Sequence, residues 1–342
     1  MTYLDHLPQA VARLIRTRYI AEFATISKDG VPIDTPLVPF ASEDLETIDS
    51  ATGLAYPTKA ERARRNPKVG MLFEGGQDEP VVSIAGIAAV RDSDLQANLE
   101  RYLSEEILTA AFSPEHVDYE TITRHAIWYF TRVIVCVKPA VVRWWRNSAA
   151  TDEAPQVWRA PEGTVYPPSD PTPAGAPSKA PWREAPPWRD LVRRAIARRA
   201  AAHLTLIDAE GFPLPIRARD VREHEEGLRL ATPRWLPASG GPASVTFEGI
   251  ETFIGQARVE GTQVILRIER AAPIMPLMAD PSEILQPGPD TKKVLVDRID
   301  YELKRRAMAW PVMPAKPPTP TAGARLRADV AFAFQGFSSS DG

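Results

Sequence analysis

The residues of this chain best suited to bind a charged ligand lie in one short basic segment, PTKAERARRNP (57–67). Lys59 and Arg62 are three positions apart, so on a helix they share one face. Two cations near a helix start could neutralise a phosphate dianion, and Thr58 stands where an N-cap residue is expected. Taken alone, a basic helix is more typical of a solvated surface than of an anion site, so the neighbouring elements must supply the case for phosphate binding.

Other kinds of catalytic or binding site have little support in the sequence. Cys136 is the only cysteine, and it lies in the apolar run VIVCVKP (133–139), which predicts a buried structural thiol and no internal disulfide. No Ser-His-Asp set or carboxylate pair is evident, so we assign no catalytic side chain. Metal-ligand spacing is also absent from the five histidines, which are His6, His116, His125, His203 and His224.

Composition and charge indicate a soluble globular protein. The 342 residues are 44% hydrophobic, enough for two cores, and the formal net charge is −3. A nucleic-acid binder usually carries a net basic charge, which this chain lacks. No apolar run reaches the roughly 18 residues of a membrane span, and the N-terminus lacks the apolar stretch of a signal peptide. We therefore expect a cytoplasmic protein whose partner is a small molecule rather than nucleic acid or membrane.

A sequence repeat organises the chain around the basic segment. FATISKDGVPI (23–33) aligns with LTLIDAEGFPL (204–214) at an offset of 181 positions, and each reads as two strands joined by a turn. The same offset relates two glycines, two prolines and the apolar faces of two preceding helices: Gly30 and Gly211, Pro32 and Pro213, Leu7 and Trp188, Val11 and Val192, Leu14 and Ala195, Ile15 and Ile196.

The repeat continues with gaps into later strands. The matching segments are 70–75 with 245–249, 81–90 with 251–259, and 132–139 with 263–270. Each copy therefore reads as a leading helix followed by about six strands, which predicts a mainly β protein built of two small antiparallel barrels. Helical segments at 92–112 and 54–69 interrupt only the first copy, and another helix, 290–310, follows the second.

Proline marks the boundaries, since 15 of the 34 prolines are concentrated in the two stretches 147–187 and 311–342. The predicted parts are a first barrel (1–146), a semi-rigid linker (147–187), a second barrel with its C-terminal helix (188–310) and an irregular tail (311–342). Trp158, Tyr166 and Trp182 could hold the linker to a domain surface, and the apolar stretch Val330 to Phe337 could dock the tail. The pair Trp144-Trp145 favours packing between domains over stacking on a ligand ring.

An ordered set of features in the first copy resembles the flavin-binding split-barrel superfamily, also called the pyridoxamine 5′-phosphate oxidase-like proteins. The resemblance covers about residues 5–145 and, more weakly, 188–275. In chain order the features are Asp29-Gly30-x-Pro32, Thr35-Pro36, the cluster Asp49-Ser50-Ala51-Thr52, Thr58-Lys59 opening a short basic helix, Asn66-Pro67 closing it, and Gly86 in a later strand.

This resemblance implies that FMN lies across the strands where two barrels meet. It assigns cofactor binding to Thr35, Thr52, Thr58, Lys59 and Arg62, with backbone groups of Pro36 and Leu37 at the polar edge of the ring. Family members are usually homodimers, so a fused chain should form an intrachain pseudo-dimer. The second copy has no counterpart of the Lys59 helix, although Arg234 lies nearby, which predicts one flavin per chain.

The function that follows from the resemblance is an FMN-dependent oxidoreductase, with hydride or electron transfer at flavin N5 and an unidentified small-molecule substrate. A deazaflavin in place of FMN fits the same fold. The alternatives from other classes are a non-catalytic flavin or heme binder, for which His125 or His203 would supply the axial ligand, and a degenerate protein that only dimerises. The colour of the purified protein separates these alternatives.

Overall fold

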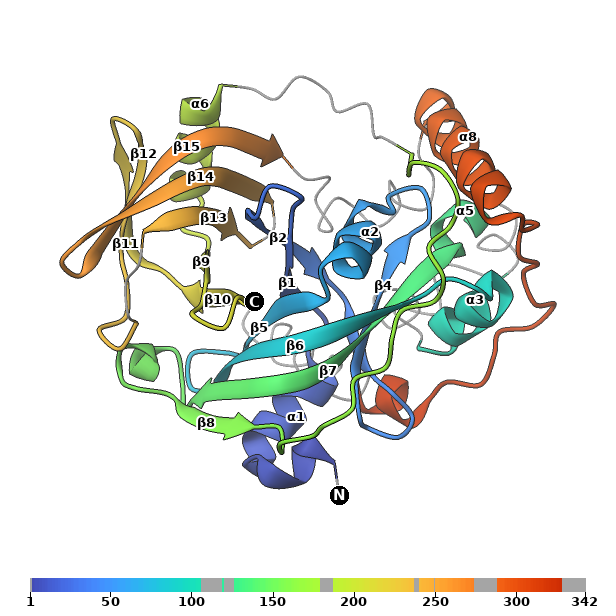
Figure 1. Cartoon of the computed structure of the whole chain (residues 1–342), viewed down its shortest axis with the longest axis horizontal. Coiled ribbons are helices and arrows are strands. Elements are labelled where there is room, and N and C mark those ends of the chain that lie inside the picture. Colours follow the sequence, from blue (N-terminus) through green and yellow to red (C-terminus); the bar gives the residue numbers. More distant parts are fainter. Residues whose placement is uncertain are drawn as a thin grey trace, which may run out of the picture.

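The computed structural model describes residues 2–105, 119, 126–178, 187–236, 240–248, 250–273 and 288–327. These residues form two antiparallel sheets that lie side by side (Figure 1). The strands of the first sheet are β1 (Ala21–Ile26), β2 (Pro32–Leu37), β3 (Pro39–Ala41), β4 (Ile48–Gly53), β5 (Lys68–Glu74), β6 (Val81–Arg91), β7 (Arg132–Trp145) and β8 (Gln156–Arg159). Those of the second are β9 (Ala202–Ile207), β10 (Pro213–Arg217), β11 (Arg219–His224), β12 (Gly227–Ala231), β13 (Gly241–Phe247), β14 (Glu251–Glu260) and β15 (Gln263–Pro273).

The strand order confirms the tandem repeat. The first sheet runs β2-β1-β5-β6-β7-β4-β3, with β8 paired to β7, and the second runs β10-β9-β13-β14-β15-β12-β11. The two orders correspond strand by strand, so that β1 matches β9, β5 matches β13, β6 matches β14 and β7 matches β15, as the sequence repeat predicts. The mainly β, two-barrel prediction is therefore correct, with seven strands on each path rather than about six, because β3 and β11 add a short strand at one edge.

The helices flank the sheets, and each barrel has its own hydrophobic core. They are α1 (Gln9–Thr17), α2 (Thr58–Arg65), α3 (Leu95–Ser104), α5 (Ile127–Phe130), α6 (Trp188–Ala197) and α8 (Pro289–Arg306), with single turns at Tyr3–His6 and Ala149–Asp152. Val11, Leu14 and Ile15 of α1 pack into the first core, as the apolar spacing predicts. The equivalent helix α6 packs Val192 and Ala195 into the second core.

Helix α8 follows the second barrel in the sequence but packs on the first (Figure 1). Its buried residues Leu295, Ile299 and Leu303 are four positions apart, so they form one face, and they join the core of the first barrel. The apolar spacing of this helix predicts a buried face but not which barrel covers it. By this packing the chain's C-terminal helix becomes part of the wall around α2.

The two barrels meet in a pseudo-symmetric interface. Ser83 Oγ of the first barrel donates to the carbonyl oxygen of Pro215 at 3.0 Å, and Thr252 Oγ1 of the second donates to that of Asp34 at 3.2 Å. These are equivalent bonds, because Asp34 and Pro215 differ by the 181-residue offset and Ser83 and Thr252 hold the same position in β6 and β14. The interface thus has the two-fold character of a homodimer within one chain.

Aromatic packing closes one end of the interface. The rings of Trp145 and Trp235, one from each half of the chain, lie 5.4 Å apart, and the indole of Trp235 donates to the carbonyl of Thr151. Trp144 packs in the first core. The predicted packing between domains therefore holds for Trp145, whereas Trp144 packs within the first barrel.

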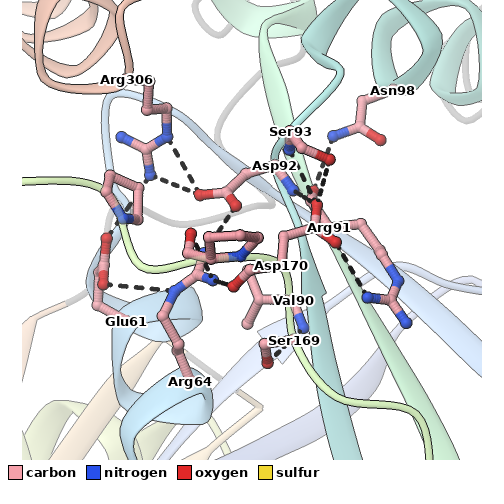
Figure 2. A network of polar contacts seen from close by, with 12 residues as sticks. Glu61, Arg64, Val90, Arg91, Asp92, Ser93, Asn98, Ser169, Asp170 and Arg306 are labelled. Carbon is pink, nitrogen blue, oxygen red and sulfur yellow. Dashed lines mark hydrogen bonds and ion pairs between the residues drawn. The ribbon is translucent and has the colours of Figure 1, made fainter.

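The proline-rich segment lies along the first barrel. Its strand β8 pairs with the second half of the long strand β7, a short piece of sheet that the proline content did not predict. The ring of Trp158 stacks on His6 at 6.1 Å. Farther on, Asp170 accepts hydrogen bonds from the backbone of Asp92 and Ser93 (Figure 2). Trp182, His125 and the stretch Val330 to Phe337 lie outside the described residues.

Candidate cofactor site between the two barrels

One face of α2 is fixed by a network of ion pairs (Figure 2). Asp92, only 2% exposed, is ion-paired with Arg64, whose Nη2 lies 2.7 Å from Asp92 Oδ1, and it accepts a hydrogen bond from Arg306 Nη2 of α8 at 2.9 Å. Glu61 of α2 pairs with Arg305 of α8. Because buried, mutually paired charges hold a single geometry, this network sets the rotation of α2 about its axis.

Lys59 and Arg62 lie on another face of α2 and contact the first sheet, which Arg65 also reaches. Lys59 Nζ donates to the carbonyl of Pro36 at 2.9 Å, and Arg62 Nε donates to Thr25 Oγ1 at 2.7 Å. Arg65 Nη2 donates to the carbonyl oxygen of Ile26, the last residue of β1, at 3.3 Å. The expected sharing of a face by Lys59 and Arg62 is therefore observed, with both side chains held by β1 and β2 rather than extended into solvent.

A fourth cation comes from the second barrel. The pKa of Arg62 is lowered to about 10, mainly by burial and also by the positive charges of Arg270 on β15 and of Arg65. Within the described ranges, no carboxylate lies at ion-pair distance from Lys59, Arg62, Arg65 or Arg270, the four residues we call the α2 cation cluster. Uncompensated cations gathered from two domains are suited to bind an anion.

Sequence reasoning missed Arg270. It expected no cation from the second copy, because it looked for a counterpart of the basic helix and found only LPASGG there. Arg270 instead lies on a strand, close to Arg62 only because the barrels pack together. No local pattern marks such a residue. Arg234, the nearby arginine, is ion-paired with Asp152 and has a largely exposed side chain.

Lys59 lies at the junction of this cluster with a group of buried carboxyls. The pKa of Lys59 is lowered to about 7, mainly by burial and also by the charge of Arg62, against the opposing charges of Glu22 and Asp34. An anion bound beside its ammonium group would favour the charged form. Lys59 is therefore a cation whose charge depends on ligand binding near neutral pH.

Asp34 on β2 faces the second barrel and is fully buried. Its Oδ2 accepts from Thr205 Oγ1 at 2.8 Å, and its Oδ1 has no hydrogen-bond partner. Burial raises the pKa of Asp34 to about 8, and the negative charge of Glu22 raises it too, while Thr205, His203 and Lys59 oppose the shift. The carboxyl therefore holds a proton at neutral pH.

The remaining predicted residues are placed as follows. Thr35 is buried and its Oγ1 has no partner, so a hydrogen-bonding group is unused there. Thr52 Oγ1 donates to the carbonyl of Tyr56 at 3.2 Å. Leu37 points into the first core and offers only its backbone. Thr58 differs from expectation: the N-cap is Pro57, and Thr58 is the exposed first residue of α2, because Pro57 already has helical backbone angles.

The candidate heme ligand His203 is fully engaged. Its Nδ1 contacts Glu22 Oε1 at 3.1 Å and its Nε2 contacts Glu74 Oε2 at 2.9 Å. Burial disfavours the imidazolium, but Glu74 and Glu22 outweigh it and raise the pKa of His203 well above its usual value. Both ring nitrogens are thereby occupied, which leaves none to coordinate iron.

Cys136 on β7 is half-buried, whereas the apolar run around it predicted a fully buried thiol. Burial and the nearby Asp49 carboxylate raise the pKa of the Cys136 thiol to about 12, so it is protonated and unsuited to act as a nucleophile. Across the residues that the structure describes, no three side chains of the metal-binding types gather into a site. Nor does any helix there have the length and apolarity to cross a bilayer.

Comparisons with known proteins gave matches among solved structures only; no family model matches the sequence, and no curated protein does. A putative pyridoxamine 5′-phosphate oxidase from Listeria innocua is 17% identical, over 40% of this chain and 96% of that one, with a TM-score of 0.29. A pyridoxamine 5′-phosphate oxidase-related, FMN-binding protein from Nostoc punctiforme is 17% identical, over 39% and 80%, with a TM-score of 0.29. An F420 reductase is 14% identical, over 41% and 100%, with a TM-score of 0.30.

Each of these matches spans about the length of one barrel, and two of the structures bear the family name that the sequence resemblance gave. At these identities and TM-scores the likeness concerns the fold alone. The repeated strand order of this chain makes it a tandem of two split barrels, which is the class of protein predicted from the sequence.

Proposed function

We propose that this chain is a flavin-dependent oxidoreductase that binds one FMN, or alternatively a deazaflavin, between its two barrels. The observation that carries the proposal is the α2 cation cluster, which joins three cations of the first barrel to Arg270 of the second without an ion-paired carboxylate among the described residues. A cofactor phosphate is a dianion, and such a cluster can neutralise it.

The residues around the cluster fit a flavin in further ways. The unused hydroxyl of Thr35 lies one residue from Pro36, whose carbonyl receives Lys59, so a ring bound along β2 would meet a hydrogen-bonding group. Asp34 lies on the same strand, and its protonated carboxyl is a second group there that can donate a hydrogen bond. The cofactor, when bound, supplies hydride or electron transfer, while the protein binds and orients it. The occupied nitrogens of His203 speak against the heme-binding alternative.

In this proposal each cation has one task. Arg62 and Arg65 bind phosphate oxygens from the helix, Arg270 closes over the phosphate from the second barrel, and Lys59 takes up a proton at Nζ as the anion arrives. Since the described residues between β12 and β13 of the second barrel include no basic helix equivalent to α2, the pseudo-symmetric position binds no phosphate. The stoichiometry is one cofactor per chain.

The visible spectrum of the purified chain tests the proposal. We expect a flavin or deazaflavin spectrum, or its appearance when FMN is added to cofactor-free protein. Lys59→Ala should lose the cofactor, whereas Arg234→Ala, which removes an exposed arginine paired to Asp152, should retain it. A Soret band would favour the heme alternative, and a chain that takes up neither FMN nor a deazaflavin would contradict the proposal.

A further inference from the structure

Two buried arginines outside the α2 cation cluster have no counterion. Arg132 begins β7 and is 9% exposed, and Arg298 lies on α8 and is 8% exposed. In each guanidinium, Nε and Nη2 are buried without a hydrogen-bond partner, and neither arginine forms an ion pair with any described residue. Buried arginines are normally paired, so two neighbouring exceptions call for an explanation.

The carboxylate nearest to Arg298 along α8 is already used. Glu302, one helical turn away, pairs with Arg305 and Arg306 and accepts a hydrogen bond from the backbone N–H of Ser178. Burial lowers the pKa of Arg298, while Tyr56 and Glu302 act in the opposite direction without contacting it as an ion pair. The helix therefore buries two N–H donors of Arg298, Nε and Nη2, for which the described part of the chain supplies no acceptor.

Arg132 is oriented by aromatic rings rather than by a carboxylate. Its guanidinium carbon lies 3.8 Å from the centre of the Tyr129 ring and 4.8 Å from that of Tyr102. Stacking on a ring face leaves the N–H donors free, because they point outward in the plane of the guanidinium. The two tyrosines thus fix the direction in which Arg132 offers its donors.

Tyr56 lies between the two guanidiniums. The guanidinium carbon of Arg298 is 5.2 Å from the centre of the Tyr56 ring. On the other side, a Cβ atom at Gly53 would lie 3.5 Å from Arg132 Nη1 and 3.6 Å from Tyr56 Cδ2, so these two groups are neighbours. Both arginines lower the pKa of Tyr56 against the larger effect of burial. The three side chains therefore form one cluster contributed by β7, α8 and the turn before α2.

We propose that Arg132 and Arg298 form a second anion site beside Tyr56, which binds the carboxylate or phosphate group of a small acidic molecule. Planar guanidiniums bind both kinds of oxyanion through paired N–H donors. Arg132 also belongs to the charges around Lys59, which places this site next to the α2 cation cluster. The identification of the bound acid as the substrate of the oxidoreductase rests on the proposed function, whereas the site itself does not.

Phosphate titration of cofactor-free protein tests the site, with inorganic phosphate as the probe and calorimetry as the readout. The Arg62→Met background weakens the α2 cation cluster and should still bind phosphate at about one site per chain. Adding Arg298→Met should weaken this binding about tenfold or more, because a charge-assisted bidentate contact is lost. Adding Lys293→Met, which removes an exposed cation from the same helix, should leave it unchanged.

Two results would overturn the site: an unchanged phosphate affinity on adding Arg298→Met, or no phosphate binding in Arg62→Met. If Arg298→Met does not fold, Arg298→Lys keeps the charge but not the planar fork, and here too unaltered affinity counts against the site. Cofactor content separates this inference from the proposed function. Arg298→Met should keep FMN binding, and Lys59→Ala should keep phosphate binding at Arg298. The second anion site and the proposed function can therefore be contradicted independently.

Discussion

Glu22 and His203 occupy equivalent positions in the two repeats, 181 residues apart, and contact each other across the interface at 3.1 Å. Equivalent residues meet only near a two-fold axis. In a dimer of identical barrels this position would bring together two carboxylates, which repel, or two imidazoles without an acceptor carboxylate. The fused chain has one of each, so the interface favours pairing of the two unlike barrels.

This contact predicts a pH-dependent stability. Because Glu74 and Glu22 raise the pKa of His203 above its unfolded value of about 6.5, the folded state binds the proton more tightly. The contribution is fully present below about pH 6.5 and is lost as pH rises through the raised folded-state pKa. Urea unfolding across this range should show the wild type losing more stability than His203→Leu.

The same variant should be less stable near neutral pH. His203→Leu leaves Glu22 and Glu74 facing each other without the intervening cation, and breaking a buried ion pair in this way costs about 3 kcal/mol or more. His224→Leu, on the edge strand β11, is the matched control and should change the free energy of unfolding little. An equal change in the free energy of unfolding for both substitutions would contradict a stabilising role of the His203 ion pairs.

Cofactor affinity should fall as pH rises above neutrality. Lys59 has a pKa of about 7 before an anion binds, and the anion favours its charged form, so binding is strongest where the ammonium exists beforehand. Between pH 7 and 9 the FMN affinity should drop by up to about tenfold per pH unit. Fluorescence titrations should show this slope in the wild type and a flatter profile in Lys59→Ala.

A side chain at Gly70 should separate the barrels. A Cβ atom there would lie 2.7 Å from Pro215 Cδ and closer still to the carbonyl oxygen of Pro213, and neither the ring nor the backbone of β10 can move freely. Gly70→Ala should therefore lower the free energy of unfolding by about 1–3 kcal/mol. Gly76→Ala, whose Cβ would meet only Glu79 at 3.5 Å, is the control, and equal losses would contradict close packing at Gly70.

Arg270 should contribute to cofactor binding without supporting the fold. It is exposed and unpaired among the described residues, so Arg270→Ala should leave thermal stability nearly unchanged. Loss of its charge-assisted contact should weaken FMN binding about tenfold to a hundredfold. Arg234→Ala should have no such effect. An Arg270→Ala chain that binds FMN as tightly as the wild type would remove the second barrel from the site.

The elements were predictable where the signal is local and repeated. The offset that aligns 23–33 with 204–214 carries β1 onto β9, and the spacing of Lys59 and Arg62 gives the face of α2. Long-range packing was not predictable. The apolar face of α8 does not specify which core it joins, and Arg270 approaches Arg62 only through the interface. The burial of the Arg298 N–H donors was equally unpredictable, because it results from the packing of α8 on the first barrel.

The most direct test compares FMN with riboflavin, which has the same ring but no phosphate. If the α2 cation cluster binds the phosphate, the cofactor-free chain takes up one FMN, binds riboflavin far more weakly, and loses this discrimination in Arg62→Met. Equal affinity for both molecules in the wild type, or discrimination that survives Arg62→Met unchanged, would contradict the account.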